Sequence, residues 1–282
     1  MAVSLIIDSN CLESDRLEQF LAASVHHTAI LTDYAAMEAY KKDAIDSIVS
    51  RMRVLAQFPA QVVVLRGTQY VCALRGRKAG LTRRMIYSEA TNSFAEFCRY
   101  ITLAQQGDAW HRKQILERES EAVRQLKLVE ESGADITSYY SVFEKQFNER
   151  EKKDIRLSKP FSKETLEKFV RLVAMFAGAL YDEHPHTGRW PKPFEWPYTF
   201  IYRSSILHYL HFFQWIRNGS PKSLNATKVR NDLIDLNFAT YATYFDGLMT
   251  DDVKLEALYT EACYYLEYLF TPALTRSWEQ PK

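Results

Sequence analysis

Acidic side chains directly follow two short apolar runs that lie at opposite ends of the chain. The run 3–7 leads into Asp8, and the run 248–249 leads into Thr250 and Asp252. If both runs are parallel strands of one sheet, their carboxyl ends meet at the edge where open α/β sheets bind ligands. Carboxylates gathered at one place are costly unless a cation neutralises them. The pattern therefore predicts a cation-binding site.

Further acids lie on two segments that we expect to be helical. Asp232 and Asp235 are three residues apart, so they share one face of a helix. The small residues that follow them would let this helix pack closely on a sheet. Glu38 lies early in a helix that begins at Asp33, directly after a second apolar run over 28–32. These elements can bring three more carboxylates to the same edge of the sheet.

The predicted cluster offers oxygen donors only. Such a site suits Mg²⁺ or Mn²⁺ rather than Zn²⁺. These ions activate water, orient a phosphodiester and stabilise the leaving oxygen of an in-line hydrolysis. The four cysteines show no C-x-x-C spacing that would indicate structural zinc. His208 and His211 are three apart on an expected helix, but no acid or thiol lies at a matching offset. We interpret them as satisfied or core-edge histidines.

The order of the acids and their flanking apolar strands resembles that of the PIN-domain nuclease family. An acid follows the first strand, another lies early in the second helix, one opens a late helix, and Thr-x-Asp follows a late strand. The resemblance covers about residues 1–60 and 228–270. It implies a metal-dependent endoribonuclease with Mg²⁺ or Mn²⁺ as cofactor. The four acids of the family map onto Asp8, Glu38, Asp235 and Asp252, with Asp232 as a fifth metal-binding acid.

The resemblance also implies how these residues would divide the work. The two acids that follow strands would bind the metal directly, and the two helical acids would bind it directly or through water. Thr250 would orient Asp252 or a bound water, and Asn10 would contact the scissile phosphate. Metal-activated water would then hydrolyse the phosphodiester bond.

A glycine-containing segment, 75–84, carries the densest basic cluster of the chain. Lysine and arginine are the side chains that bind a phosphate backbone, so we predict that this segment holds substrate near the acids. The alternative is a solvated loop. No G-x-x-x-x-G-K-[ST] motif is present, so the segment does not indicate nucleoside triphosphate hydrolysis. The predicted substrate-binding residues of the cluster are Arg77, Lys78, Arg83 and Arg84.

The long middle of the chain has no counterpart in small members of the family and reads as helical almost throughout. The pattern predicts one long helix before it, over 33–58, and two within it, over 110–131 and 135–155, separated at Ser132-Gly133. We therefore expect an α/β fold whose parallel-sheet, PIN-like core is flanked by helices. The core takes residues 1–85 and 227–282, and a mostly α-helical insertion takes 86–226.

Composition limits the partners and the compartment. The net charge is +1, so any nucleic-acid binding must come from local patches. No basic segment followed by an apolar run marks a signal peptide, and no apolar run approaches the ~20 residues of a membrane span. We expect a cytoplasmic protein with reduced cysteines and no membrane partner. RNA is the expected substrate, and the helical insertion could bind a protein regulator or a second copy of the chain.

Three other interpretations stay open. An aspartyl-phosphate phosphatase also begins with a strand and an Asp, but it needs a second acid where this chain has Asn10. A non-catalytic module that binds RNA or protein would use the acids as helix caps and solvated surface. This explains Asp33 at a helix start, but not Asp8 or Asp252 at strand ends. The third interpretation is a helical scaffold with a decayed nuclease core.

Overall fold

The fold is built on one sheet of four parallel strands. The computed structural model describes residues 1–40, 44–76, 78–185, 190–219 and 226–269. All three strand pairs are parallel, which confirms the predicted α/β class and the parallel sheet flanked by helices. The strands are β1 (Val3–Ile7), β2 (His27–Leu31), β3 (Val62–Val64) and β4 (Gly247–Met249), in the order β3-β2-β1-β4.

The order in which strands are added to the sheet reverses at β1. The chain adds β2 and β3 on one side of β1, and much later it returns to place β4 on the other side. Ile6 pairs with Ile30 of β2 and with Leu248 of β4. The amide of Asp8 donates to the carbonyl of Met249 at 3.0 Å, so the pairing continues past the strand end. In open α/β sheets, the crevice outside such a reversal point is where ligands bind.

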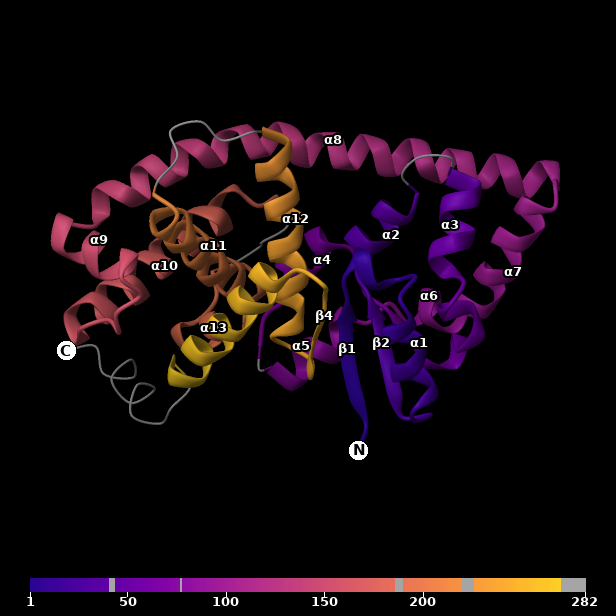
Figure 1. Cartoon of the computed structure of the whole chain (residues 1–282), viewed down its shortest axis with the longest axis horizontal. Helices are drawn as coiled ribbons and strands as arrows, with labels where there is room; N and C mark the ends of the chain where they lie inside the picture. Colours follow the sequence, from indigo (N-terminus) through magenta and orange to yellow (C-terminus); the bar gives the residue numbers. More distant parts are fainter. Residues whose placement is uncertain (41–43, 77, 186–189, 220–225, 270–282) are drawn as a thin grey trace.

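Thirteen α-helices and four short 3₁₀ turns are present within the described ranges. Figure 1 shows the longest helix, α8, running across the molecule above the carboxyl ends of the strands, and α8 packs against α2, α3, α7 and α12. The helices are α1 (Asp15–Ala22), α2 (Asp33–Ala39), α3 (Ala44–Met52), α4 (Thr68–Cys72), α5 (Lys78–Met85), α6 (Ser88–Asn92), α7 (Phe94–Gln105), α8 (Ala109–Gln146), α9 (Glu149–Arg156), α10 (Lys163–Glu183), α11 (Phe200–Arg217), α12 (Ala226–Ala242) and α13 (Val253–Leu269). The 3₁₀ turns are η1 (Ser9–Cys11), η2 (Leu55–Gln57), η3 (Pro59–Gln61) and η4 (Pro193–Tyr198).

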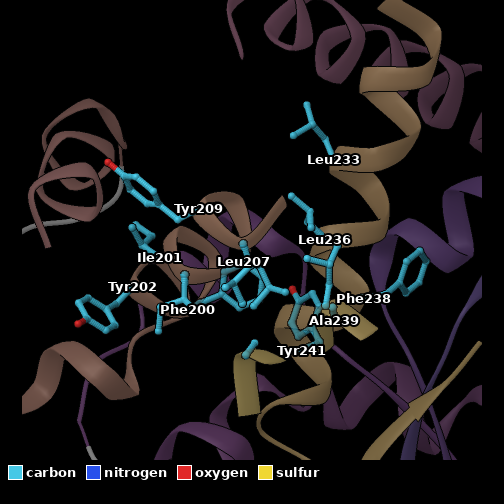
Figure 2. Packing of buried hydrophobic residues seen from close by; sticks show 14 of the residues in the cluster. Phe200, Ile201, Tyr202, Leu207, Tyr209, Leu233, Leu236, Phe238, Ala239 and Tyr241 are labelled. Atoms are coloured by element: carbon cyan, nitrogen blue, oxygen red, sulfur yellow. The ribbon is translucent and has the colours of Figure 1, made fainter. Parts of the chain in front are cut away.

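Side chains alternate between the two faces of the sheet, and each face has its own apolar cluster. Ile6 and Ile30 pack into one cluster with residues of α11 and α12, part of which Figure 2 shows. Ile7 and Leu31 pack into the other cluster with residues of α3, α7 and α8. Helices from 86–226 therefore cover both faces of the sheet. Whether 86–226 forms a separate insertion unit stays a prediction. No helix of the described ranges is long and apolar enough to span a bilayer.

The predicted single helix over 33–58 is wrong. Helix α2 ends at Ala39, α3 begins at Ala44, and the next helical turn is the separate η2. The helix cap is also one residue earlier than expected, because the Thr32 hydroxyl accepts from the amide of Ala35 at 3.2 Å. Asp33 instead accepts from the backbone amide of Thr68 at 2.6 Å and from its hydroxyl at 2.8 Å. Asp33 therefore joins the end of β2 to the start of α4.

The predicted helix break at Ser132-Gly133 is also wrong, since α8 continues through both residues to Gln146. One glycine inside a helix costs about 1 kcal/mol relative to alanine, which tertiary packing readily offsets. The helix ends where Asn148 caps the following helix, α9. The Asn148 side chain accepts from the amide of Glu151 at 2.9 Å, and the Glu151 carboxylate accepts from the amide of Asn148 at 2.8 Å. This reciprocal cap gives an acceptor to two backbone amides at the start of α9, those of Asn148 and Glu151.

A glycine that follows a helical segment predicts the helix end, but Gly247 has a different role. Helix α12 already ends at Ala242, and Gly247 is the first residue of β4, paired with Leu5. A Cβ atom at this position would lie 3.1 Å from Cδ2 of Leu5. The missing side chain therefore allows β4 to lie close to β1 instead of ending the helix.

Candidate active site

One hydroxyl group joins the two halves of the predicted site. The Thr250 side chain is buried directly after β4, and its Oγ1 donates to Oδ2 of Asp8 at 2.6 Å. The same Oγ1 accepts from the backbone amide of Asp252 at 3.0 Å. Thr250 was expected to orient Asp252 or a water; it orients the Asp8 carboxylate and the Asp252 backbone. Residues 242 positions apart in sequence thus meet at the carboxyl edge of the sheet.

Asp8 is 3% exposed, and burial raises the pKa of its carboxyl group. The hydrogen bond from Thr250 opposes this shift, as do the backbone amides of Ser9 and Asn10, whereas the charge of Glu38 adds to it. The backbone of η1 therefore turns its donors towards Asp8. The Asn10 side chain itself is exposed.

Glu38, on α2, is held by a residue that the sequence analysis missed. The hydroxyl of Ser9 donates to Oε2 of Glu38, while Oδ1 of Asp8 lies 3.5 Å from the same hydroxyl. A hydroxyl has one proton, so the contact with Glu38 is the hydrogen bond and the longer one is at the limit. The only signal in the sequence is that Ser9 directly follows Asp8.

The pKa of Asp235, on α12, indicates that the predicted acids lie near one another. Its pKa is raised to about 8, first by burial and then by the charges of four other carboxylates. In decreasing order of effect these are Asp8, Glu38, Asp232 and Asp252. All five predicted acids therefore lie within one electrostatic neighbourhood, and Asp235 holds a proton at neutral pH. Their roles in catalysis and metal binding stay predictions.

The carboxylates are near one another but are not gathered into a closed shell. Within the described ranges, no three His, Cys, Asp or Glu side chains are close enough to form a metal-binding group. The donor set nevertheless suits a hard divalent cation, since it offers oxygen atoms, and burial together with the neighbouring carboxylates raises the pKa of Asp235. A bound cation would replace the proton of Asp235 and draw the acids together.

Asp252 has a structural role that the sequence analysis excluded. Its Oδ1 accepts from the amides of Lys254 at 2.7 Å and Leu255 at 3.2 Å, so it caps the start of α13. The expectation that no capping role accounts for Asp252 is therefore wrong. Both bonds use the same oxygen, and a negative charge at a helix N-terminus is favourable. The cap fixes the carboxylate at the end of β4.

Asp232 is paired with a histidine from a distant helix. Nε2 of His211, on α11, lies 3.4 Å from Oδ2 of Asp232, and the hydroxyl of Tyr140 is hydrogen-bonded to Nδ1 of the same ring. Burial raises the pKa of the Tyr140 hydroxyl. Tyr140 and Asp232 therefore contact the two nitrogens of the same His211 ring. An acid does lie beside His211 in space, although no sequence offset indicated it.

His208 matches its predicted role. Its Nδ1 donates to the carbonyl of Ser204 at 2.7 Å, and burial lowers its pKa to about 4. It is a satisfied, neutral core histidine.

The predicted substrate-binding role of the basic cluster stays a prediction. Arg83, on α5, is exposed. Arg84 donates to the carbonyl of Gly80 at 3.1 Å and to the carbonyl of Arg75, so it fixes its own loop. Within the described part of the chain, no hydrogen bond or ion pair joins either arginine to the carboxylates. Lys78 begins α5, and Arg77 lies outside the described residues.

An arginine that the sequence analysis passed over lies closer to the site. Arg16, on α1, donates to the carbonyl of Thr250 at 3.2 Å and lies 3.8 Å from the Asp251 carboxylate. Cys11 is buried nearby, and its pKa is raised to about 12 by burial and by the charges of Asp251 and Asp8. Its thiol is therefore neutral and no nucleophile.

Comparisons with protein-family models, with curated proteins and with solved structures found no match to this chain.

Proposed function

We propose that this chain is a PIN-like, metal-dependent endoribonuclease that hydrolyses phosphodiester bonds at the carboxylate cluster. The supporting observation is the raised pKa of Asp235, which results from burial and from four other carboxylates that the sequence pattern had already singled out. The cluster lies beside the pair β1 and β4, where the chain reverses across the sheet. A ligand site is expected at such a point.

The chain's own residues hold and orient the proposed site. Thr250 fixes the Asp8 carboxylate, Ser9 holds Glu38, and the start of α13 fixes one oxygen of Asp252. Asp232 and Asp235 present further oxygens from one face of α12. When bound, Mg²⁺ or Mn²⁺ would activate water and neutralise charge on the scissile phosphate. Without a cation the cluster would repel a phosphodiester, so cleavage requires the metal.

A non-catalytic scaffold that binds RNA or protein is the second candidate. It is favoured by the lack of a closed metal-binding group among the described residues. Groups of the protein already contact several of the acids. Thr250 donates a hydrogen bond to Asp8, an amide of α13 donates to Asp252, and His211 pairs with Asp232. In such a scaffold, a divalent cation would change neither stability nor binding.

Cleavage assays distinguish the two candidates. Purified protein is incubated with mixed RNA and with single-stranded DNA, in Mn²⁺, Mg²⁺ or chelator. We expect metal-dependent cleavage of RNA by the wild type and none by the Asp8→Asn variant, which loses a charge at nearly constant volume. The matched control is Asp154→Asn on α9, whose carboxylate pairs with Lys159 outside the cluster. Full activity of the Asp8→Asn variant would contradict the proposal, and so would wild-type cleavage that is as fast in chelator as in Mn²⁺ or Mg²⁺.

A further inference from the structure

An arginine stacked between two exposed tyrosines lies beyond the end of β3. The guanidinium carbon of Arg66 is 4.8 Å from the ring centroid of Tyr70 and 5.2 Å from that of Tyr87. The two tyrosines are 48% and 38% exposed. A cation over aromatic faces is favourable, and more so where water is partly excluded. Three planar groups thus lie together on an accessible surface, which we call the Arg66 platform.

Backbone hydrogen bonds fix the Arg66 platform to the sheet. The amide of Arg66 donates to the carbonyl of Met85, and the amide of Tyr87 donates to the carbonyl of Val64, both at 2.8 Å. Leu65 and Ile86 form an antiparallel bridge between these two bonds. Tyr70 is carried by the short helix α4, which begins at Thr68, with three residues between it and the end of β3. The three side chains are therefore held by regular structure instead of a free loop.

The charge of Arg66 is not neutralised within the described part of the chain. No carboxylate there forms an ion pair with its guanidinium group, whose contacts are the two rings. Two acids lie near the platform: Glu89 accepts a long hydrogen bond of 3.4 Å from the Tyr87 hydroxyl, and the Asp33 carboxylate accepts from the amide and hydroxyl of Thr68. The net charge of the chain is only +1, so attraction of a phosphate must come from local cations such as Arg66.

The platform lies at the same edge of the sheet as the carboxylates. Val63 pairs with Ile30, and Ile30 pairs with Ile6, so the end of β3 is level with the end of β1. Two strand spacings separate these strands, which is about 10 Å. The strand ends that lead to the Arg66 platform and to Asp8 therefore lie along one edge of the sheet.

The geometry points to a binding site for the unpaired bases of single-stranded nucleic acid. Bases would stack on the exposed faces of Tyr70 and Tyr87, and a neighbouring phosphate would meet the guanidinium of Arg66. In a duplex the bases are already stacked on one another, so the platform selects single strands. This inference rests on the proposed function for what happens to the strand, but it concerns binding and not cleavage.

Binding is measured by fluorescence anisotropy in chelator, where the carboxylate cluster does not act. The probes are one labelled single-stranded RNA, the matching DNA strand and the matching duplex. Tyr70→Leu and Tyr87→Leu should each weaken single-strand binding roughly fivefold or more, because each removes a stacking surface. Tyr70→Phe and Tyr87→Phe keep that surface and should bind as the wild type does.

Arg66→Gln tests the phosphate contact separately. It should lower the slope of log affinity against log salt by about 0.7, which is the value for one phosphate contact on a single strand. The tyrosine variants should leave this slope unchanged. The matched controls are Tyr264→Leu on α13, which is 68% exposed, and Arg150→Gln on α9, which is also exposed. Both should bind as the wild type does. Thermal unfolding of every variant shows whether it is folded.

Several outcomes would overturn the platform. These are no binding of single strands by the wild type, unchanged binding by folded Leu and Gln variants, or an equal loss in the two control variants. A loss confined to the DNA strand would remove it as an RNA site. If the platform variants lose binding but the wild type shows no cleavage, the proposed nuclease activity is wrong and the proposed binding site is retained. If the wild type cleaves RNA but all platform variants bind normally, the binding site is wrong and the nuclease activity is retained.

Discussion

Thr250 shows how one side chain can set the geometry of a site made from two distant segments. Its hydroxyl proton is committed to Asp8, so its lone pair is left for the Asp252 amide. The hydrogen bond also lowers the pKa of the Asp8 carboxyl group against the effect of burial. Thr250 therefore acts on both the position and the charge of the acid.

Thr250→Val removes the hydroxyl at nearly constant volume. It removes the hydroxyl that donates to Oδ2 of the buried Asp8 and leaves the Asp252 amide without this acceptor. We expect the free energy of unfolding to fall by about 1–3 kcal/mol, and cleavage to fall with it. Thr250→Ser retains the hydroxyl and should restore most of both. Urea unfolding and the cleavage assay measure the effects; a valine variant as stable as the wild type would show that the hydroxyl orients nothing.

Sequence patterns identified the acids at residue scale but not the groups that hold them. Asp8 and Asp252 follow apolar strands, and that position is visible in the sequence. The contacts of Ser9 with Glu38 and of His211 with Asp232 depend on how α2 and α11 are placed. No spacing within one helix or strand carries that information. The same holds for Arg84, whose hydrogen bonds to the carbonyls of Gly80 and Arg75 no spacing in the basic segment indicated.

At the scale of elements, Asp252 belongs both to the site and to the start of α13. Asp252→Asn keeps an oxygen for the cap and removes the charge, whereas Asp252→Ala removes both. Both variants should lose cleavage. Only the alanine variant should lose stability, by about 1 kcal/mol, as measured by urea unfolding in chelator. An active asparagine variant would assign Asp252 to the cap alone.

Helix periodicity predicted where helices lie better than where they end. The apolar stripes of α2 and α3 are continuous enough to suggest one helix, but the chain turns after Ala39. Ser132-Gly133 suggested a break, yet α8 passes through, because packing against α2 and α12 decides more than local propensity. The strands β1, β2 and β4 match the predicted apolar runs to within one residue at either end.

At the scale of the whole molecule, the acids make stability depend on pH and on metal. Asp235 has a folded-state pKa of about 8 against an ordinary value of about 4, so the folded state binds a proton that the unfolded state has lost. The free energy of unfolding should therefore decrease as pH rises between these two values, by up to about 1.4 kcal/mol per pH unit.

A divalent cation should reverse this trend, because it replaces the proton and binds only the folded state. Urea unfolding at several pH values from about 5 to 8, with chelator and with Mn²⁺, measures both effects. Asp235→Asn should flatten the pH dependence in chelator and reduce the gain from Mn²⁺. A wild-type protein whose stability is flat with pH in chelator, and unchanged by Mn²⁺, would show that the acids are not coupled.

The pairing of β1 with β4 also has a consequence for the time at which the site exists during synthesis. Asp8 leaves the ribosome early, but its partner Thr250 follows 242 residues later. At about 5–20 residues per second, that interval lasts roughly 10 to 50 seconds. For most of it, the nascent chain has only Asp8 and Glu38 of the five acids and lacks β4, which completes the sheet. The proposed site is therefore complete only after β4 has been synthesised and has paired with β1.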